Sequence, residues 1–275
     1  MTDRNRDICF VPAGELVRLY RARKTSPLEV MEAVLARIDA VNPAVNAYVT
    51  VARESALAEA RRATRALGRR RTPLRPLHGV PVSIKDLYAT KGMRTTWGSL
   101  IYKDHVPSDD DLVVQRLKSA GAIVVGKTNT PEFGAGGTTF NAVFGTTRNP
   151  WNTELTCGGS SGGAAVAVAT GMGPVAQGSD LGGSLRTPAA FCGVVGLRTT
   201  PGLIPSYPRT LAWDTLGVAG PIARTVADPW VHSTRMTANS ASVTSARGIR
   251  LRLRDMVSCP VADLRDNLSR MQARN

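Results

Sequence analysis

The chain has 275 residues, 43% of them hydrophobic, which is enough for one large domain or two small ones with a substantial buried core. It has no apolar run near the ~20 residues of a membrane span, and its four dispersed cysteines and three histidines form no metal-binding pattern. A net charge of +14 would suit nucleic acid, but the basic run from Arg61 to Arg75 has no interleaved aromatic residues that could stack on bases. We therefore expect no membrane, metal or nucleic-acid partner. The few cysteines, and an N-terminus unlike a secretory signal, favour a cytoplasmic protein.

Residues 1–75 are predicted to form a helical layer that packs on the rest of the protein. Ser26-Pro27-Leu28-Glu29 combines a capping box with proline at the first helical position, so a helix is expected to begin there. Apolar residues recur at helical spacing from Met31 to Val41, and Asn42-Pro43 is expected to end this helix. A second helix is predicted from about Arg53 to Leu67, with Gly68 as its stop.

From residue 76 onward, short apolar runs alternate with helical patterns. Strands are predicted at Gly79–Ile84 and Ala122–Val125. Between them, a helix is predicted over Asp109–Ala120, with acidic residues in its first turn and Gly121 after its last. This alternation indicates the α/β fold class, with a sheet covered by helices on both faces.

Two glycine- and serine-rich segments follow, Cys157–Gly163 and Gly178–Pro188. The first leads directly into a small-residue helix predicted over Ala164–Ala169, so several backbone N–H groups at its start are free to bind a negative group. It is not a phosphate loop of the GxxxxGK type, because no lysine follows its glycines. The run Gly158-Gly-Ser-Ser-Gly162 also fits the short GxSxG motif of a nucleophilic serine.

A serine needs a base before it can act as a nucleophile. A Ser-His-Asp hydrolase would take its histidine from downstream, where His232 is the only one, since His78 and His105 precede the motif. A lysine whose pKa is lowered by burial is another possible base. Lys85 is a candidate because it directly follows the apolar run Val80–Ile84.

Five blocks between Leu77 and Asp228 resemble, in order and spacing, the amidase signature family. These blocks are His78–Asp86, Gly158–Gly163, Gly178–Ala189, Phe191–Leu197 and Gly220–Asp228. The resemblance implies an amidase-signature-type mixed sheet covered by helices on both faces, with residues 76–228 as the catalytic core. It also implies hydrolysis of the C–N bond of a small carboxamide, without a metal or an organic cofactor.

The resemblance further implies a Ser-cisSer-Lys catalytic apparatus. Ser184 matches the nucleophile of the family, Ser160 the bridging serine that follows a cis peptide bond, and Lys85 the general base. A hydroxyl can link a lysine to a more distant serine because it both donates and accepts a hydrogen bond.

Other residues match the surroundings of this apparatus. The backbone of Leu181, Gly182 and Gly183 is expected to form the oxyanion loop. The expected supporting residues are Ser161, Ser179, Asp180 and Arg186.

Residues 229–275 resemble nothing in the family, and a short helix is predicted at 262–273. We therefore expect a truncated or frameshifted amidase, with an aberrant, poorly ordered basic tail and the C-terminal part of the fold missing. Such a half-built sheet would expose an open edge and apolar surface, so marginal stability is expected. Substrate identity and oligomeric state are left open.

Three other functions stay open. The chain could be the catalytic subunit of a tRNA-dependent glutamine amidotransferase, although Leu203–Leu216 looks more like a stand-alone amidase. It could also be a non-catalytic amidase remnant. A Ser-His-Asp esterase using His232 is the most distant alternative.

Overall fold

The computed structural model describes residues 8–68, 74–208, 211 and 213–228. They lie in a compact unit that spans Met1–Thr237, whereas the second unit, Ala238–Asn275, lies wholly outside the described residues. The predicted tail and its short helix therefore lie outside the described residues as well. No helix in the described ranges is long and apolar enough to cross a bilayer.

The N-terminal segment is largely helical. Helix α2 (Ala13–Arg21), for which no separate prediction was made, is followed by the two predicted helices, α3 (Pro27–Val45) and α4 (Arg53–Leu67). At the start of α3 the predicted capping box forms: Ser26 Oγ accepts the Glu29 N–H at 3.2 Å, and the Glu29 carboxylate accepts the Ser26 N–H at 2.8 Å. The predicted bounds of α4 are also confirmed, with Gly68 at its C-cap.

The predicted end of the first long helix at Asn42-Pro43 is wrong. Helix α3 continues to Val45 and ends at Asn46, which has a left-handed φ of 51°. The Asn42 side chain accepts the N–H groups of Ala47 and Tyr48 at 2.9 and 2.7 Å, which organises the turn after the helix. Asparagine at this position therefore serves the following turn rather than stopping the helix.

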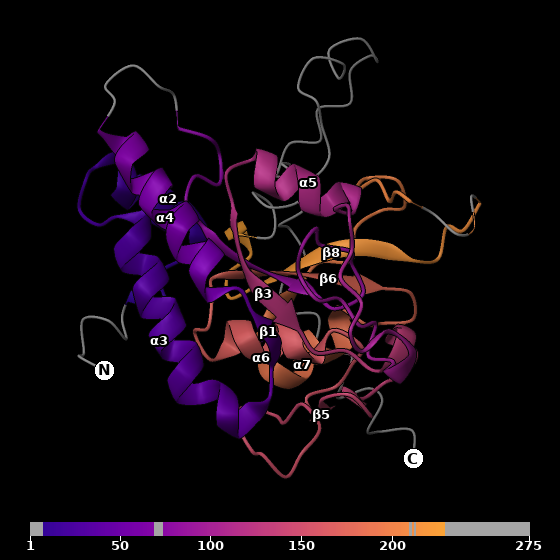
Figure 1. Ribbon diagram of the computed structural model, residues 1–275. Helices are drawn as coiled ribbons and strands as arrows, with labels where there is room; N and C mark the ends of the chain where they lie inside the picture. Colours follow the sequence, from indigo (N-terminus) through magenta and orange to yellow (C-terminus); the bar gives the residue numbers. More distant parts are fainter. Residues whose placement is uncertain (1–7, 69–73, 209–210, 212, 229–275) are drawn as a thin grey trace, which may run out of the picture. The chain divides into compact units, whose positions relative to one another are not determined.

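A six-stranded mixed sheet forms the centre of the fold (Figure 1). Its strand order is β1-β3-β2-β6-β8-β7. The strands are β1 (Tyr48–Val51), β2 (Pro81–Lys85), β3 (Ile123–Thr128), β6 (Val175–Asp180), β7 (Val195–Gly196) and β8 (Val218–Ala223). Strands β3, β2 and β6 are parallel, and β1, β8 and β7 pair antiparallel with their neighbours. The strands predicted at 79–84 and 122–125 correspond to β2 and β3, and β1 is a strand that the helical pattern of the first 75 residues did not predict.

Apolar side chains on both faces of the sheet are covered by helices. On one face Ile123, Val125, Ala176 and Ile222 join the core with α3, α4 and α6 (Gly162–Ala169). On the other face Val82, Ile84, Val124 and Val175 pack with α5 (Leu112–Ser119). The α/β fold class with helices on both faces is confirmed, as a parallel sheet centre requires.

The remaining short elements connect these layers. They are the 3-10 turns η1 (Leu100–Tyr102) and η2 (Glu132–Gly134), strands β4 (Phe140–Asn141) and β5 (Gly145–Thr146), and helix α7 (Arg186–Cys192). Helix α5 begins at Leu112 rather than at Asp109, because the carboxylates of Asp110 and Asp111 accept the N–H groups of Lys91 and Ala89 in the preceding loop.

Candidate active site

Lys85 ends strand β2, in the parallel centre of the sheet between β3 and β6. Its side chain is fully buried, and its Nζ lies 2.7 Å from Ser160 Oγ, 3.0 Å from Ser161 Oγ and 3.0 Å from Ser179 Oγ. Three hydroxyls from two separate segments thus converge on one amine at the carboxyl end of the parallel strands, where α/β folds commonly bind ligands.

The environment of Lys85 favours the neutral amine. Burial lowers its pKa to about 7, although the Asp180 carboxylate acts in the opposite direction. A neutral amine has two N–H donors and one lone pair, so it can donate to two hydroxyls and accept a proton from the third. The shortest of the three contacts is with Ser160. This arrangement can take a proton from the Ser160 hydroxyl.

Ser160 and Ser161 lie in the loop that opens helix α6, and the Gly159–Ser160 peptide bond is cis. Ser161 Oγ accepts the Ser179 N–H at 3.2 Å and donates to the Ser179 carbonyl at 3.1 Å, so it joins this loop to β6. The close approach needs glycine at 178, where a Cβ would lie 2.9 Å from Ser161 Oγ. The glycines of these segments therefore allow the serine loop to reach the strand.

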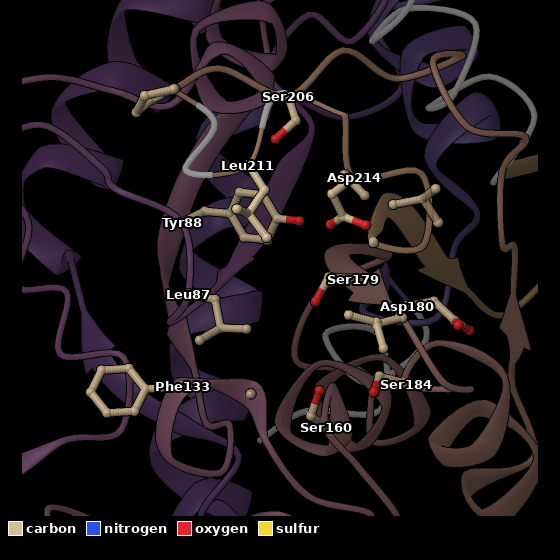
Figure 2. Close-up of a pocket in the computed structure, with 16 residues that line it drawn as sticks. Leu87, Tyr88, Phe133, Ser160, Ser179, Asp180, Ser184, Ser206, Leu211 and Asp214 are labelled. Carbon is tan, nitrogen blue, oxygen red and sulfur yellow. The ribbon is translucent and has the colours of Figure 1, made fainter.

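Ser184 lines a pocket of about 360 Å³ together with Ser160 and Ser179. Figure 2 shows Ser160 and Ser184 at one end of the pocket and Ser206, Leu211 and Asp214 at the other. The Ser184 hydroxyl has no hydrogen-bond partner among the described residues, so it is available to a bound molecule. The apolar and aromatic part of the lining consists of Leu87, Tyr88, Phe133, Leu181, Pro208, Leu211, Val218 and Ala219.

Asp180 holds the segment that carries Ser184. Its buried carboxylate accepts the Gly183 N–H at 2.8 Å, the Leu185 N–H at 3.1 Å and the Arg186 guanidinium at 3.0 and 3.1 Å. Arg198 donates to it as well, at 3.0 Å. Burial acts to raise the pKa of Asp180, but the hydrogen bonds from Arg186 and the two backbone groups hold it well below its usual range. The carboxylate therefore stays ionised.

In the loop that was expected to bind an oxyanion, one backbone N–H group is already used within the protein. The N–H of Gly183 is used by Asp180, so it does not face the pocket as a free donor. The N–H groups of Leu181, Gly182 and Ser184 have no hydrogen-bond partner among the described residues. In the part of the chain that the structure describes, these three N–H groups, unlike that of Gly183, are therefore not used within the protein.

The sequence did not point to several residues of this site, among them Arg198 and Tyr88. Arg198 follows the last residue of a recognised block, and a single arginine there carries no signal of contact with Asp180. Tyr88 lines the pocket and follows Lys85 by three positions. It comes just after the carboxyl end of a predicted strand, a position that is typical of ligand-binding residues in α/β folds and could have indicated it.

The histidines take no part in the pocket lining that the structure describes. His78 Nε2 lies 3.0 Å from the Ala63 carbonyl, and His105 stacks on Trp97, whereas His232 lies outside the described residues. No group of three His, Cys, Asp or Glu side chains in the described part of the chain could hold a metal ion.

A sequence model of the Amidase family matches residues 29–247. The chain belongs to the amidase signature family. The match runs past Asp228, where the resemblance was expected to end.

Many curated proteins are similar to this chain, and two of them illustrate the range. A glutamyl-tRNA(Gln) amidotransferase subunit of Carboxydothermus hydrogenoformans is 47% identical over 222 residues, or 81% of this chain and 46% of the relative. An acylamidase of Rhodococcus erythropolis is 45% identical over 230 residues, or 83% of this chain and 47% of the relative. The chain thus spans about half the length of the curated relatives it matches.

A solved structure gives a similar result. The crystal structure of a bacterial aryl acylamidase of the amidase signature family is 35% identical, with a TM-score of 0.79 over 83% of this chain and 48% of the other. At this identity the likeness supports the family as well as the fold.

Proposed function

We propose that this amidase signature protein hydrolyses the C–N bond of a small carboxamide, with Ser184 as nucleophile, Ser160 as proton relay and Lys85 as base. One observation carries the proposal: a fully buried lysine, with its pKa lowered to about 7, contacts Ser160 at 2.7 Å beside the pocket lined by Ser184. Such a lysine can act as a general base near neutral pH.

The proposed reaction proceeds through an acyl-enzyme. Ser184 Oγ attacks the carbonyl carbon while its proton passes to Ser160, whose own proton passes to the Lys85 amine. The tetrahedral oxyanion is stabilised by free backbone N–H groups such as those of Gly182 and Ser184. The proton then returns through Ser160 to the leaving nitrogen, the C–N bond breaks, and an ester on Ser184 remains. Water attacks this ester with the same relay and releases the acid.

Supporting roles follow from the contacts around the relay. We assign Ser161 and Ser179 to the orientation of the Lys85 amine, which both contact at 3.0 Å. We assign Asp180 and Arg186 to holding the segment that carries Ser184. These residues touch no reacting atom in the proposed mechanism.

We also propose residues 76–228 as the catalytic core and residues 1–75 as a layer that packs on it. The layer contributes strand β1, which pairs with β3 of the core. A cytoplasmic setting is proposed from the sparse cysteines, and the three that the structure describes are free thiols.

A second candidate is the catalytic subunit of a tRNA-dependent amidotransferase, favoured by the 47% identity to an amidotransferase subunit. The same residues would then release ammonia from glutamine. Hydrolysis of simple anilides by the isolated chain supports the stand-alone amidase, whereas glutaminase activity that needs added partner subunits supports this second candidate.

The test of the proposal is labelling of the purified chain with a serine-reactive fluorophosphonate, followed by location of the adduct by mass spectrometry. We expect an adduct on Ser184 that is absent in Ser184→Ala and at least about 10²-fold slower in Lys85→Met. The exposed Lys103→Met is the matched control and keeps the wild-type rate. A folded chain without an adduct would instead be the non-catalytic remnant, and an adduct lost in His232→Ala but kept in Lys85→Met would indicate a Ser-His-Asp esterase.

A further inference from the structure

A second lysine, Lys127 on β3, is as deeply buried as Lys85 and has no part in the proposed reaction. In the parallel pair of β2 and β3, Lys127 lies opposite Ile84 and Thr128 lies opposite Lys85. Side chains of paired residues share a face and neighbours along a strand alternate. The side chains of Lys127 and Lys85 therefore leave the sheet on opposite faces.

The Lys127 ammonium is surrounded by one loop, the connection from Asp86 to Trp97. Its Nζ donates to the Tyr88 carbonyl, to Thr90 Oγ1 at 3.2 Å and to Thr95 Oγ1 at 2.9 Å. The Asp86 carboxylate lies 3.9 Å away and balances its charge. All three protons of the ammonium thus have an acceptor in the same loop.

Asp86, the first residue of the same loop, forms hydrogen bonds to the residues at its other end. Its carboxylate accepts the Thr96 hydroxyl at 2.6 Å and the Thr96 N–H at 3.1 Å, and its carbonyl accepts the Trp97 N–H at 3.0 Å. The first and last residues of the loop are therefore tied together around the buried ammonium.

This loop forms one wall of the pocket. Leu87 and Tyr88 line it (Figure 2), and the Tyr88 phenol interacts with the side chains of Ser179 and Gln177. Ser179 in turn contacts the Lys85 amine. A continuous path of contacts runs from Lys127 through Tyr88 and Ser179 to the base.

We propose that Lys127 is a positioning residue that holds Leu87 and Tyr88 in place as the wall against which the amide substrate packs. The inference rests on the proposed hydrolase function. A buried ion pair is a weak source of stability, because desolvation of its charges offsets their attraction. Three directed hydrogen bonds to one loop, by contrast, hold the backbone of that loop in a defined position relative to the nucleophile.

The test compares Lys127→Met, which keeps the shape of the side chain but removes its donors, with the exposed Lys103→Met. For a hydrolysed anilide, we expect Lys127→Met to raise KM about tenfold and to change kcat less than about threefold. We expect the rate of fluorophosphonate labelling at Ser184 to change less than about threefold, since this small probe depends little on contact with Leu87 and Tyr88. A fall in kcat and labelling with an unchanged KM would overturn the inference, as would wild-type kinetics.

Thr95→Val is a milder variant that keeps the cation and removes one acceptor. Should Lys127→Met not fold, Thr95→Val decides the question, with an expected rise in KM of about threefold and no change in kcat; an unchanged KM overturns the inference.

Hydrogen–deuterium exchange separates this inference from the proposed function, because it needs no activity. We expect exchange in residues 86–97 to rise at least about tenfold in either variant, while that of β6 stays constant. If the wild-type chain neither hydrolyses amides nor labels at Ser184, the proposed function fails, and unchanged exchange in residues 86–97 would then overturn the positioning role separately.

Discussion

The Lys85 amine and the Ser160 hydroxyl lie 2.7 Å apart, and both residues are buried. No carboxylate lies within hydrogen-bond distance of the Lys85 Nζ among the described residues; its partners there are three hydroxyls. Lys127, by contrast, has Asp86 at 3.9 Å, and its pKa is lowered less, to about 8. The two buried lysines differ in their counter-charge, which suits one to proton transfer and the other to holding a loop.

The labelling rate of Ser184 is expected to depend on pH through Lys85. Burial lowers the pKa of Lys85 to about 7, and the neutral amine, which is the proposed base, predominates above that pH. The rate therefore rises about tenfold per pH unit below pH 7 and levels off above it. Fluorophosphonate labelling reactions, quenched after set times at pH values from 5.5 to 9.5, measure this dependence of the rate on pH. A rate that still climbs toward pH 10 would show a lysine with its ordinary pKa.

The free energy of unfolding is also expected to depend on Lys85. In the unfolded chain this lysine keeps its proton up to a pKa of 10.5, whereas in the folded chain it loses the proton above about 7. Between these values the unfolded state binds more protons, so stability rises with pH by about 1.4 kcal/mol per unit. Urea unfolding at pH 7.5, 8.5 and 9.5 measures this, with Lys85→Met as the reference that lacks the contribution of Lys85. A constant difference between the two proteins would contradict the burial of Lys85.

Asp180→Asn is expected to slow labelling of Ser184 by about 10²-fold and to lower the melting temperature. A side-chain amide has one acceptor oxygen, so it cannot serve Gly183, Leu185 and the two arginines together, and the segment with Ser184 loses its anchor. The same measurements on the exposed Asp104→Asn control for the loss of a charge. Equal labelling rates for Asp180→Asn and the wild type would rule out this anchoring role.

Gly163→Ala is expected to destabilise the protein by about 2–3 kcal/mol. A Cβ at this position would lie 2.4 Å from the Asn129 N and 2.7 Å from the Ala47 O, which are backbone atoms that cannot move alone. The matched control is Gly14→Ala in α2, where a Cβ meets nothing within 4 Å and alanine gains about 0.5–1 kcal/mol. Chemical denaturation of both variants tests this difference, and equal stabilities would contradict the close packing of α6.

Several signals carried by neighbouring residues were read correctly from the sequence, although the helix end predicted at Asn42-Pro43 was wrong. The capping box at Ser26 and the glycine stop at Gly68 depend on bonds between residues three or four apart, so a short window contains all the partners. The apolar run before Lys85 likewise indicated a buried strand. Strand β1 was not predicted because its four residues form a strand by pairing with β3, which follows much later in the chain.

The order of the glycine- and serine-rich blocks in the sequence was sufficient to indicate the family and to single out Lys85, Ser160 and Ser184. The tertiary structure alone decided how these groups meet: which hydroxyls surround the Lys85 amine, that Gly183 gives its N–H to Asp180, and that Arg198 joins them. Hydrogen bonds and pKa values depend on distance and desolvation, and both are set by segments far apart in the chain that come together only in the folded sheet.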